Sequence, residues 1–232
     1  MRVGLLLADH VRPGFRILAG DYPDLFAAFF SEHPGIEMVT FDLAAGEFPH
    51  DLGVCDAWII TGSRRSVYED VGWILQLADL VRRLDRERRK LVGICFGAQM
   101  IGHALGGEVG PAPQGWQVGL KQVAVKGFEA WMTPEVESFR ILHSNADQIL
   151  RPPDRLRVLG SSDGVPVSMV AVGEHFLGFQ GHPEFIPSYS AVLMEARRGL
   201  IPDAVVDAGL ASLSNGPDTR LLATWIARFL EG

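Results

Sequence analysis

The stretch of sequence that decides the fold is Gly93-Ile94-Cys95-Phe96-Gly97. It follows a continuous apolar run, residues 91–94, which is typical of a buried strand, and it opens a predicted helix over residues 97–105. Glycines two residues either side of Cys95 match the sharp G-x-S-x-G turn, with a thiol in place of the hydroxyl. A free cysteine is often only a small core residue. The flanking glycines favour a functional thiol here, placed near a helix N-terminus whose partial positive charge favours the thiolate.

Strands and helices alternate on both sides of this stretch. Continuous or alternating apolar runs predict strands over residues 3–7, 36–43, 57–60 and 91–94. Helices are predicted over residues 24–32, 71–89, 97–105, 188–197, 203–213 and 218–230. This order indicates an α/β fold, with a mostly parallel central sheet flanked by helices. Short β-rich runs at 117–125, 155–160, 167–172 and 176–179 predict a small added antiparallel element at one edge. We expect a single domain over residues 1–232.

Composition narrows the class of protein further. The chain of 232 residues has 21 basic and 28 acidic side chains, a net charge of −7 that argues against nucleic-acid binding. No signal peptide is recognisable, and no apolar run approaches the roughly 20 residues needed to cross a bilayer, so we expect a cytoplasmic protein with no membrane contact. The two cysteines, Cys55 and Cys95, have neither zinc-site nor disulfide spacing. The expected site therefore contains no metal.

A base for the thiol is available in Phe179-Gln180-Gly181-His182-Pro183-Glu184. His182 and Glu184 are two residues apart, so both side chains lie on one face of an extended segment. A carboxylate in that position can orient the imidazole while the other ring nitrogen takes the thiol proton. Alone, such a short motif often matches by chance in a surface turn. Together with the turn around Cys95, it indicates a Cys-His-Glu triad.

A third motif, Thr61-Gly62-Ser63, follows the predicted strand over residues 57–60. By itself it is only a turn signal. Ligands of α/β sheets collect outside the carboxyl ends of the strands, however, and a glycine there can turn its N–H toward a nucleophile. With the N–H of Phe96, the N–H of Gly62 would form a two-donor oxyanion hole.

These motifs resemble the class I (triad) glutamine amidotransferase family, in the branch of the amidotransferase domain of GMP synthase. The nucleophile signature is similar over residues 93–99 and the base signature over residues 181–184. Further similar features are Ser66-Val67-Tyr68, Leu105-Gly106-Gly107 and Trp116-Gln117-Val118-Gly119. The resemblance implies a flavodoxin-like α/β fold and no cofactor.

The resemblance also implies a role for each matched residue. Cys95 would attack the side-chain carboxamide of glutamine to form a γ-glutamyl thioester, with His182 as general base and Glu184 orienting it. Backbone N–H groups of Gly62 and Phe96 would hold the oxyanion. Residues implied to bind the substrate are Gln99, Ser63, Ser144 and Asn145.

One segment departs from the family pattern. Relatives of GMP synthase carry Ser-His-x-Asp between the two signatures, whereas this chain reads His143-Ser144-Asn145-Ala146-Asp147. Either Asn145 replaces that histidine, or His143-Ser144 follows the His-Ser form of other branches. The departure leaves substrate preference open without affecting the triad.

Three functions are compatible with these residues. The main hypothesis is a glutaminase that cleaves the γ-amide of glutamine and passes ammonia to a separate synthase subunit. The alternative is a stand-alone hydrolase of γ-glutamyl peptides or metabolites, which uses the same thioester. The third is a binding or regulatory module without activity, against which the intact set of Cys95, His182 and Glu184 argues.

Overall fold

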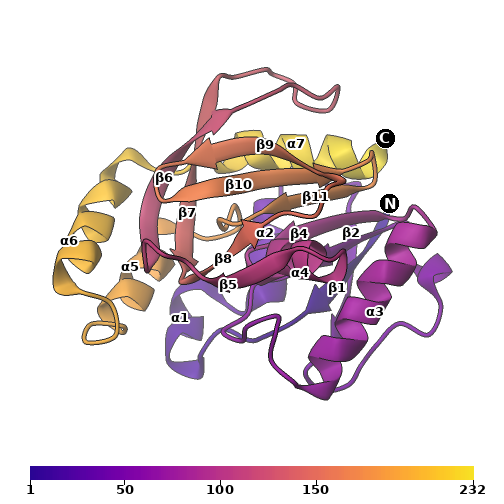
Figure 1. Ribbon diagram of the computed structural model, residues 1–232, viewed down its shortest axis with the longest axis horizontal. Helices are drawn as coiled ribbons and strands as arrows, with labels where there is room; N and C mark the ends of the chain where they lie inside the picture. The colour runs from indigo at the N-terminus through magenta and orange to yellow at the C-terminus, as the bar shows by residue number, and fades with distance from the viewer.

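A nine-stranded mixed sheet forms the centre of the computed structural model, which describes all residues from Met1 to Gly232 (Figure 1). Its first five strands in spatial order are parallel: β2 (Glu37–Asp42), β1 (Arg2–Leu7), β3 (Ala57–Ile60), β4 (Lys90–Ile94) and β11 (Phe176–Phe179). The next four are antiparallel: β10 (Val165–Val172), β9 (Leu156–Ser162), β6 (Gln117–Val125) and β7 (Ser138–Asn145). A separate pair consists of β5 (Glu108–Pro111) and β8 (Asp147–Arg151).

Helices cover both faces of the parallel half. Helices α2 (Tyr22–Phe29) and α7 (Thr219–Glu231) pack into one hydrophobic cluster, and α3 (Gly72–Arg86) and α4 (Phe96–Ala104) pack into another. Because successive side chains of a strand point to opposite faces, Leu5 of β1 joins the first cluster and Leu6 the second. Helices α5 (Pro187–Glu195) and α6 (Asp203–Ser212) lie against β7 and β6 (Figure 1). Shorter helices are α1 (Arg16–Ala19) and the 3-10 turns Pro13–Phe15, Leu52–Val54 and Leu213–Asn215.

The α/β class predicted from the sequence is confirmed, and the antiparallel part is larger than the sequence indicates. Residues 176–179, predicted as part of an edge element, instead lie inside the sheet, where β11 pairs in parallel with β4. Strands β5, β7 and β8 were not predicted. In β7 the buried polar side chains of His143 and Asn145 interrupt the apolar pattern that identifies a strand.

The carboxyl ends of the parallel strands meet at one edge of the sheet. Register pairs Ile60 of β3 with Gly93 of β4, and Phe179 of β11 with Ile94 of β4. The segments that follow these strands, residues 61–65, 95–99 and 180–184, therefore emerge side by side, which is where ligands of such sheets bind. None of the helices combines the length and the apolar character that a membrane crossing requires.

Candidate active site

Cys95 occupies a strained turn between β4 and α4. Its backbone has φ of 51° and ψ of −102°, a region that side-chain-bearing residues rarely adopt. A Cβ at Gly97 would lie 2.5 Å from the carbonyl oxygen of Ile60, and one at Gly93 would overlap the backbone of Gly97. The two glycines are thus required by close backbone approach, as the sequence predicts. The turn leaves Cys95 only 5% exposed, at the floor of a cavity.

His182 and Glu184 form a buried pair beside this turn. The Nδ1 of His182 lies 2.8 Å from Oε1 of Glu184, and the two residues are 3% and 2% exposed. The imidazole stacks on the ring of Phe185, with centroids 3.8 Å apart and planes 11° apart. The backbone N–H of His182 donates to the carbonyl of Leu142 in β7 over 2.7 Å. Packing and hydrogen bonding therefore fix the orientation of the ring. Its contact with Glu184 is made through Nδ1, so Nε2 is not engaged by that carboxylate.

The charge of His182 follows from these neighbours. Burial alone lowers the pKa of a histidine, because it disfavours the charged form. The negative charge of Glu184, the charge of Cys95, and hydrogen bonds to both outweigh burial and raise the pKa of His182 to about 10. The imidazole is accordingly protonated at neutral pH, with the thiol within reach.

Gly62 lies directly under the imidazole. A Cβ at Gly62 would stand 2.6 Å from Cε1 of His182, so only glycine fits between the strand end and the ring. The turn is held by Thr61, whose hydroxyl accepts from the N–H of Ala8 over 3.0 Å. Phe96 is the first residue of α4, and the N–H groups of a helix's first turn have no partner within the helix.

A cavity of about 320 Å³ opens above Cys95. The four residues predicted to bind a substrate all contribute to its wall: Ser63, Gln99, Ser144 and Asn145. Two of them also position the chain, because the side-chain amide nitrogens of Gln99 and Asn145 both donate to the carbonyl of Asp147, over 2.7 and 2.9 Å. Ser63 accepts from the N–H of Arg65 over 3.1 Å.

His143 does not reach this cavity. It is completely buried in β7, and the loss of solvation lowers its pKa to about 3 despite a 3.2 Å contact between its Nδ1 and Oδ1 of Asn145. Ser144 and Asn145 form the wall instead. The sequence leaves two alignments open: Asn145 in place of a histidine, or His143-Ser144 as the His-Ser form. In the structure Asn145 lines the cavity and His143 does not, so β7 contributes no imidazole to the cavity.

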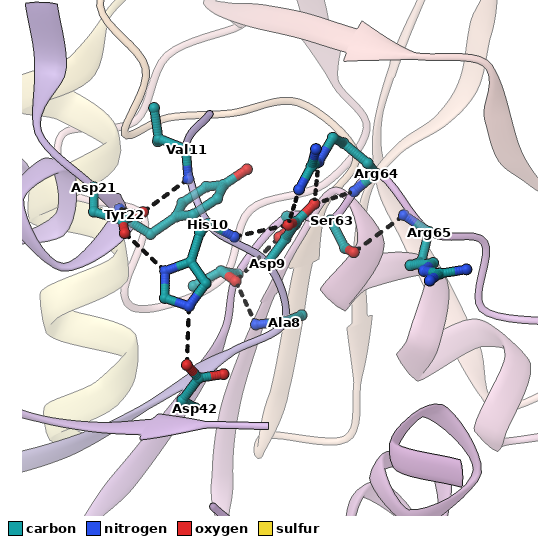
Figure 2. A network of polar contacts seen from close by, with 12 residues as sticks. Ala8, Asp9, His10, Val11, Asp21, Tyr22, Asp42, Ser63, Arg64 and Arg65 are labelled. Carbon is teal, nitrogen blue, oxygen red and sulfur yellow. Dashed lines mark hydrogen bonds and ion pairs between the residues drawn. The ribbon is translucent and has the colours of Figure 1, made fainter. Parts of the chain in front are cut away.

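Sequence reasoning missed the arginines of the site. Four of them line the cavity from separate parts of the chain: Arg12, Arg64, Arg65 and Arg197. No local pattern in the sequence marks these four arginines. His10 likewise had no predicted partner, yet its ring bridges Asp21 and Asp42 over 2.7 and 2.9 Å (Figure 2). The only available signal was position, since residues 9–12 and 63–65 follow strands β1 and β3.

The fold and the site define an α/β protein with a cysteine at a strand-to-helix turn and a His-Glu pair beside it. A model of the family described as glutamine amidotransferase class-I matches residues 36–197, and the chain therefore belongs to that family of amidohydrolases. The fold is shared by a glutamine amidotransferase from Thermotoga maritima, at a TM-score of 0.80 and 18% identity, over 100% of this chain and 98% of that one.

Relatives of two kinds are similar in sequence. Gamma-glutamyl peptidase 5 of Arabidopsis thaliana is 31% identical over 100% of this chain and 96% of its own length. Gamma-glutamyl peptidase 2 of the same plant is 30% identical over 92% and 89%. The glutamine-hydrolyzing GMP synthase of Aeropyrum pernix is 28% identical over 64% of this chain but only 27% of its own length.

Proposed function

We propose that this protein is a stand-alone hydrolase of γ-glutamyl amides in small peptides or related metabolites, with Cys95 as its nucleophile. The observation that carries the proposal is the similarity to gamma-glutamyl peptidases along nearly the whole length of both chains. The similarity to the GMP synthase is lower, at 28% identity over 64% of this chain, and this favours the peptidase function over a glutaminase that serves a synthase.

The geometry of Cys95, His182 and Glu184 supports a thioester mechanism. With His182 protonated, the thiolate of Cys95 attacks the γ-carbonyl carbon, and the oxygen becomes an oxyanion. Backbone N–H groups of Gly62 and Phe96 are the proposed donors to that oxyanion. When the intermediate collapses, the C–N bond breaks and His182 gives its proton to the leaving amine.

Hydrolysis of the thioester completes the cycle. The neutral His182 takes a proton from water, and the resulting hydroxide attacks the same carbonyl carbon. Collapse of the second intermediate breaks the C–S bond, which releases glutamate and restores the thiolate beside the protonated imidazole. Glu184 keeps Nδ1 of the ring hydrogen-bonded throughout, so that Nε2 faces the reacting atoms.

A side-by-side assay tests the proposal. Glutamate release by the purified protein is measured with glutamine and with a γ-glutamyl dipeptide, and Cys95→Ser serves as the control. We expect a kcat/KM at least about tenfold higher for the dipeptide, and loss of essentially all activity in the variant.

The opposite pattern of activity would favour a glutaminase function instead. Slow, Cys95-dependent release from glutamine, without cleavage of the dipeptide, would point to a glutaminase that awaits a synthase. Full activity of Cys95→Ser would falsify the assignment of the nucleophile.

A further inference from the structure

The four arginines of the cavity fall into two pairs with different electrostatic surroundings. Arg64 and Arg65 are neutralised by neighbouring carboxylates. Nη2 of Arg64 lies 2.7 Å from Oδ1 of Asp9, and Nη1 of Arg65 lies 2.8 Å from Oε2 of Glu69. In Figure 2 the guanidinium of Arg64 folds back onto Asp9, while the side chain of Arg65 extends away from that pair. The charges of these two arginines are therefore balanced within the protein.

Arg12 and Arg197 have no carboxylate within ion-pair distance. The Nη1 of Arg197 donates to Oγ of Ser144 over 2.6 Å, and its guanidinium lies over the ring of Trp116, 5.1 Å from the centroid. Burial, followed by the positive charge of Arg12, lowers the pKa of Arg197. The two guanidiniums therefore repel each other across the cavity. The charge of Cys95 offsets this only in part for Arg197, and no carboxylate pairs with either arginine.

The cavity has a single carboxylate of its own against these two charges. It belongs to Asp147, whose Oδ2 accepts from the hydroxyl of Ser66 over 2.5 Å. Cys95, which also lines the wall, is balanced by the protonated His182 beside it, so the remaining unpaired groups, Arg12, Arg197 and Asp147, leave an excess of one positive charge. Arg197 is partly buried, and an uncompensated charge that is withdrawn from water is costly, so a site of this kind favours an anion. Planar guanidinium groups match a carboxylate in particular.

The charge of the cavity discriminates between the two classes of substrate. Glutamine has one ammonium and one carboxylate and is neutral overall. A γ-glutamyl amino acid has a second carboxylate, on the leaving amine, and is a monoanion. A cavity with one positive charge in excess complements the monoanion and gives no advantage to glutamine.

We infer, on the basis of the proposed function, that Arg12 and Arg197 bind the carboxylate of the leaving amino acid or peptide. The protein then selects γ-glutamyl peptides with a free carboxylate over glutamine and over neutral γ-glutamyl amides. Arg197, held by Ser144 and Trp116, is the more ordered partner of the carboxylate. Arg12, which is exposed and whose guanidinium makes no hydrogen bond within the protein, completes the site from the rim.

The test compares γ-glutamylalanine with γ-glutamylalaninamide, which differ only in the carboxylate. For the wild-type protein we expect kcat/KM to be about tenfold or more higher for the acid. Arg197→Gln should lower this ratio about tenfold, and Arg12→Gln about threefold, because the exposed charge is better screened. Arg197→Lys, which keeps the charge, should retain part of the selectivity. Circular dichroism and the urea midpoint of each variant report, independently of activity, whether it is folded.

Arg65→Gln is the matched control, since this arginine lines the same cavity but is paired with Glu69. Its ratio should stay within about twofold of the wild type, in line with the small effect of an exposed ion pair. An equal drop in Arg65→Gln and Arg197→Gln would overturn the inference. So would variants of Arg12 and Arg197 that lose activity equally on acid and amide, because the arginines would then bind the glutamyl part.

Binding of the acid and the amide to the Cys95→Ala variant tests this inference independently of the proposed function. Calorimetric titration of that variant with the acid and the amide measures selectivity without turnover. Tighter binding of the acid that disappears in the Arg197→Gln background supports the inference even if the wild-type protein cleaves neither compound. Equal binding of both compounds by a protein that does cleave them would sink the inference and leave the proposed function standing.

Discussion

The parallel and antiparallel halves of the sheet contribute different parts of the site. The residues proposed for chemistry follow strands of the parallel half: Gly62 after β3, Cys95 after β4, and His182 after β11. The far wall of the cavity comes from the antiparallel half and its neighbours, with Ser144 and Asn145 in β7. We infer that the parallel half supplies the reaction, whereas substrate selection draws on both halves, with Arg12 after β1 and Arg197 held by Ser144 of β7.

Two completely buried histidines show the same contrast in their charge. His182, after β11, has Glu184 and Cys95 beside it, and its pKa is raised to about 10. His143, in β7, has no carboxylate beside it, and burial together with the positive charges of Lys121 and His182 lowers its pKa to about 3 despite the contact with Asn145. Burial is common to both, so the neighbouring charge decides whether the imidazole is protonated.

The largest expected effect comes from a pair of variants, one in each half. Cys95→Ala should lower kcat about 10⁴-fold or more on every γ-glutamyl substrate, because it removes the attacking atom. Ser144→Ala should lower kcat/KM only about tenfold, mainly through KM, since Ser144 holds Arg197 rather than the reacting atoms. Steady-state kinetics on one dipeptide measure both. Comparable losses of kcat in the two variants would contradict the division of roles.

Glu184→Gln should lower kcat about 10²- to 10⁴-fold by weakening the orientation of His182. It should also change the pH profile. Activity needs a proton on His182 for the leaving amine, so it is lost as pH rises through the pKa of about 10. Removal of the Glu184 charge lowers that pKa, and the alkaline limb should move to lower pH. A pH–rate profile from pH 7 to 11 measures the shift, and an unmoved limb would show that another group titrates there.

Gly97→Ala tests the backbone contact on which the turn depends. The new Cβ would meet the carbonyl of Ile60 at 2.5 Å, and relief of that overlap should destabilise the protein by about 1–3 kcal/mol. Gly72→Ala at the start of α3 is the matched control, because nothing lies within 4 Å of its added Cβ. Its effect should be within about 0.5 kcal/mol of zero. Urea denaturation measures both, and similar stabilities would refute the close approach.

The smallest expected effect concerns His143 in the antiparallel half. Its folded pKa of about 3 lies below the unfolded value near 6.5, so the unfolded chain binds a proton that the native state excludes. Stability should therefore fall as pH decreases from about 6.5 toward 3. Between pH 7 and 5 the wild type should lose about 1–2 kcal/mol more than His143→Gln, which does not titrate. Parallel pH dependences of urea unfolding in the two proteins would show that His143 is accessible to protons.

The sequence alone was sufficient for four of the five strands of the parallel half, β1 to β4, but not for the place of β11. The central strands β1, β3 and β4 are mostly apolar because helices cover both faces, and the glycines around Cys95 are required by local backbone contact. His182 and Glu184 are two residues apart, so their pairing is also local. These features need no knowledge of distant contacts, which is why the α/β class and this cluster could be predicted.

What only the tertiary structure decided is the size of the antiparallel half and the charge of the cavity. In strand β7 the buried polar residues His143 and Asn145 interrupt the apolar pattern, so the sequence there resembles a loop. Arg12 and Arg197 are separated by most of the sequence, and whether an arginine is neutralised depends on which carboxylate folds beside it. Ion pairing is a property of three-dimensional distance, which no local pattern in the sequence records.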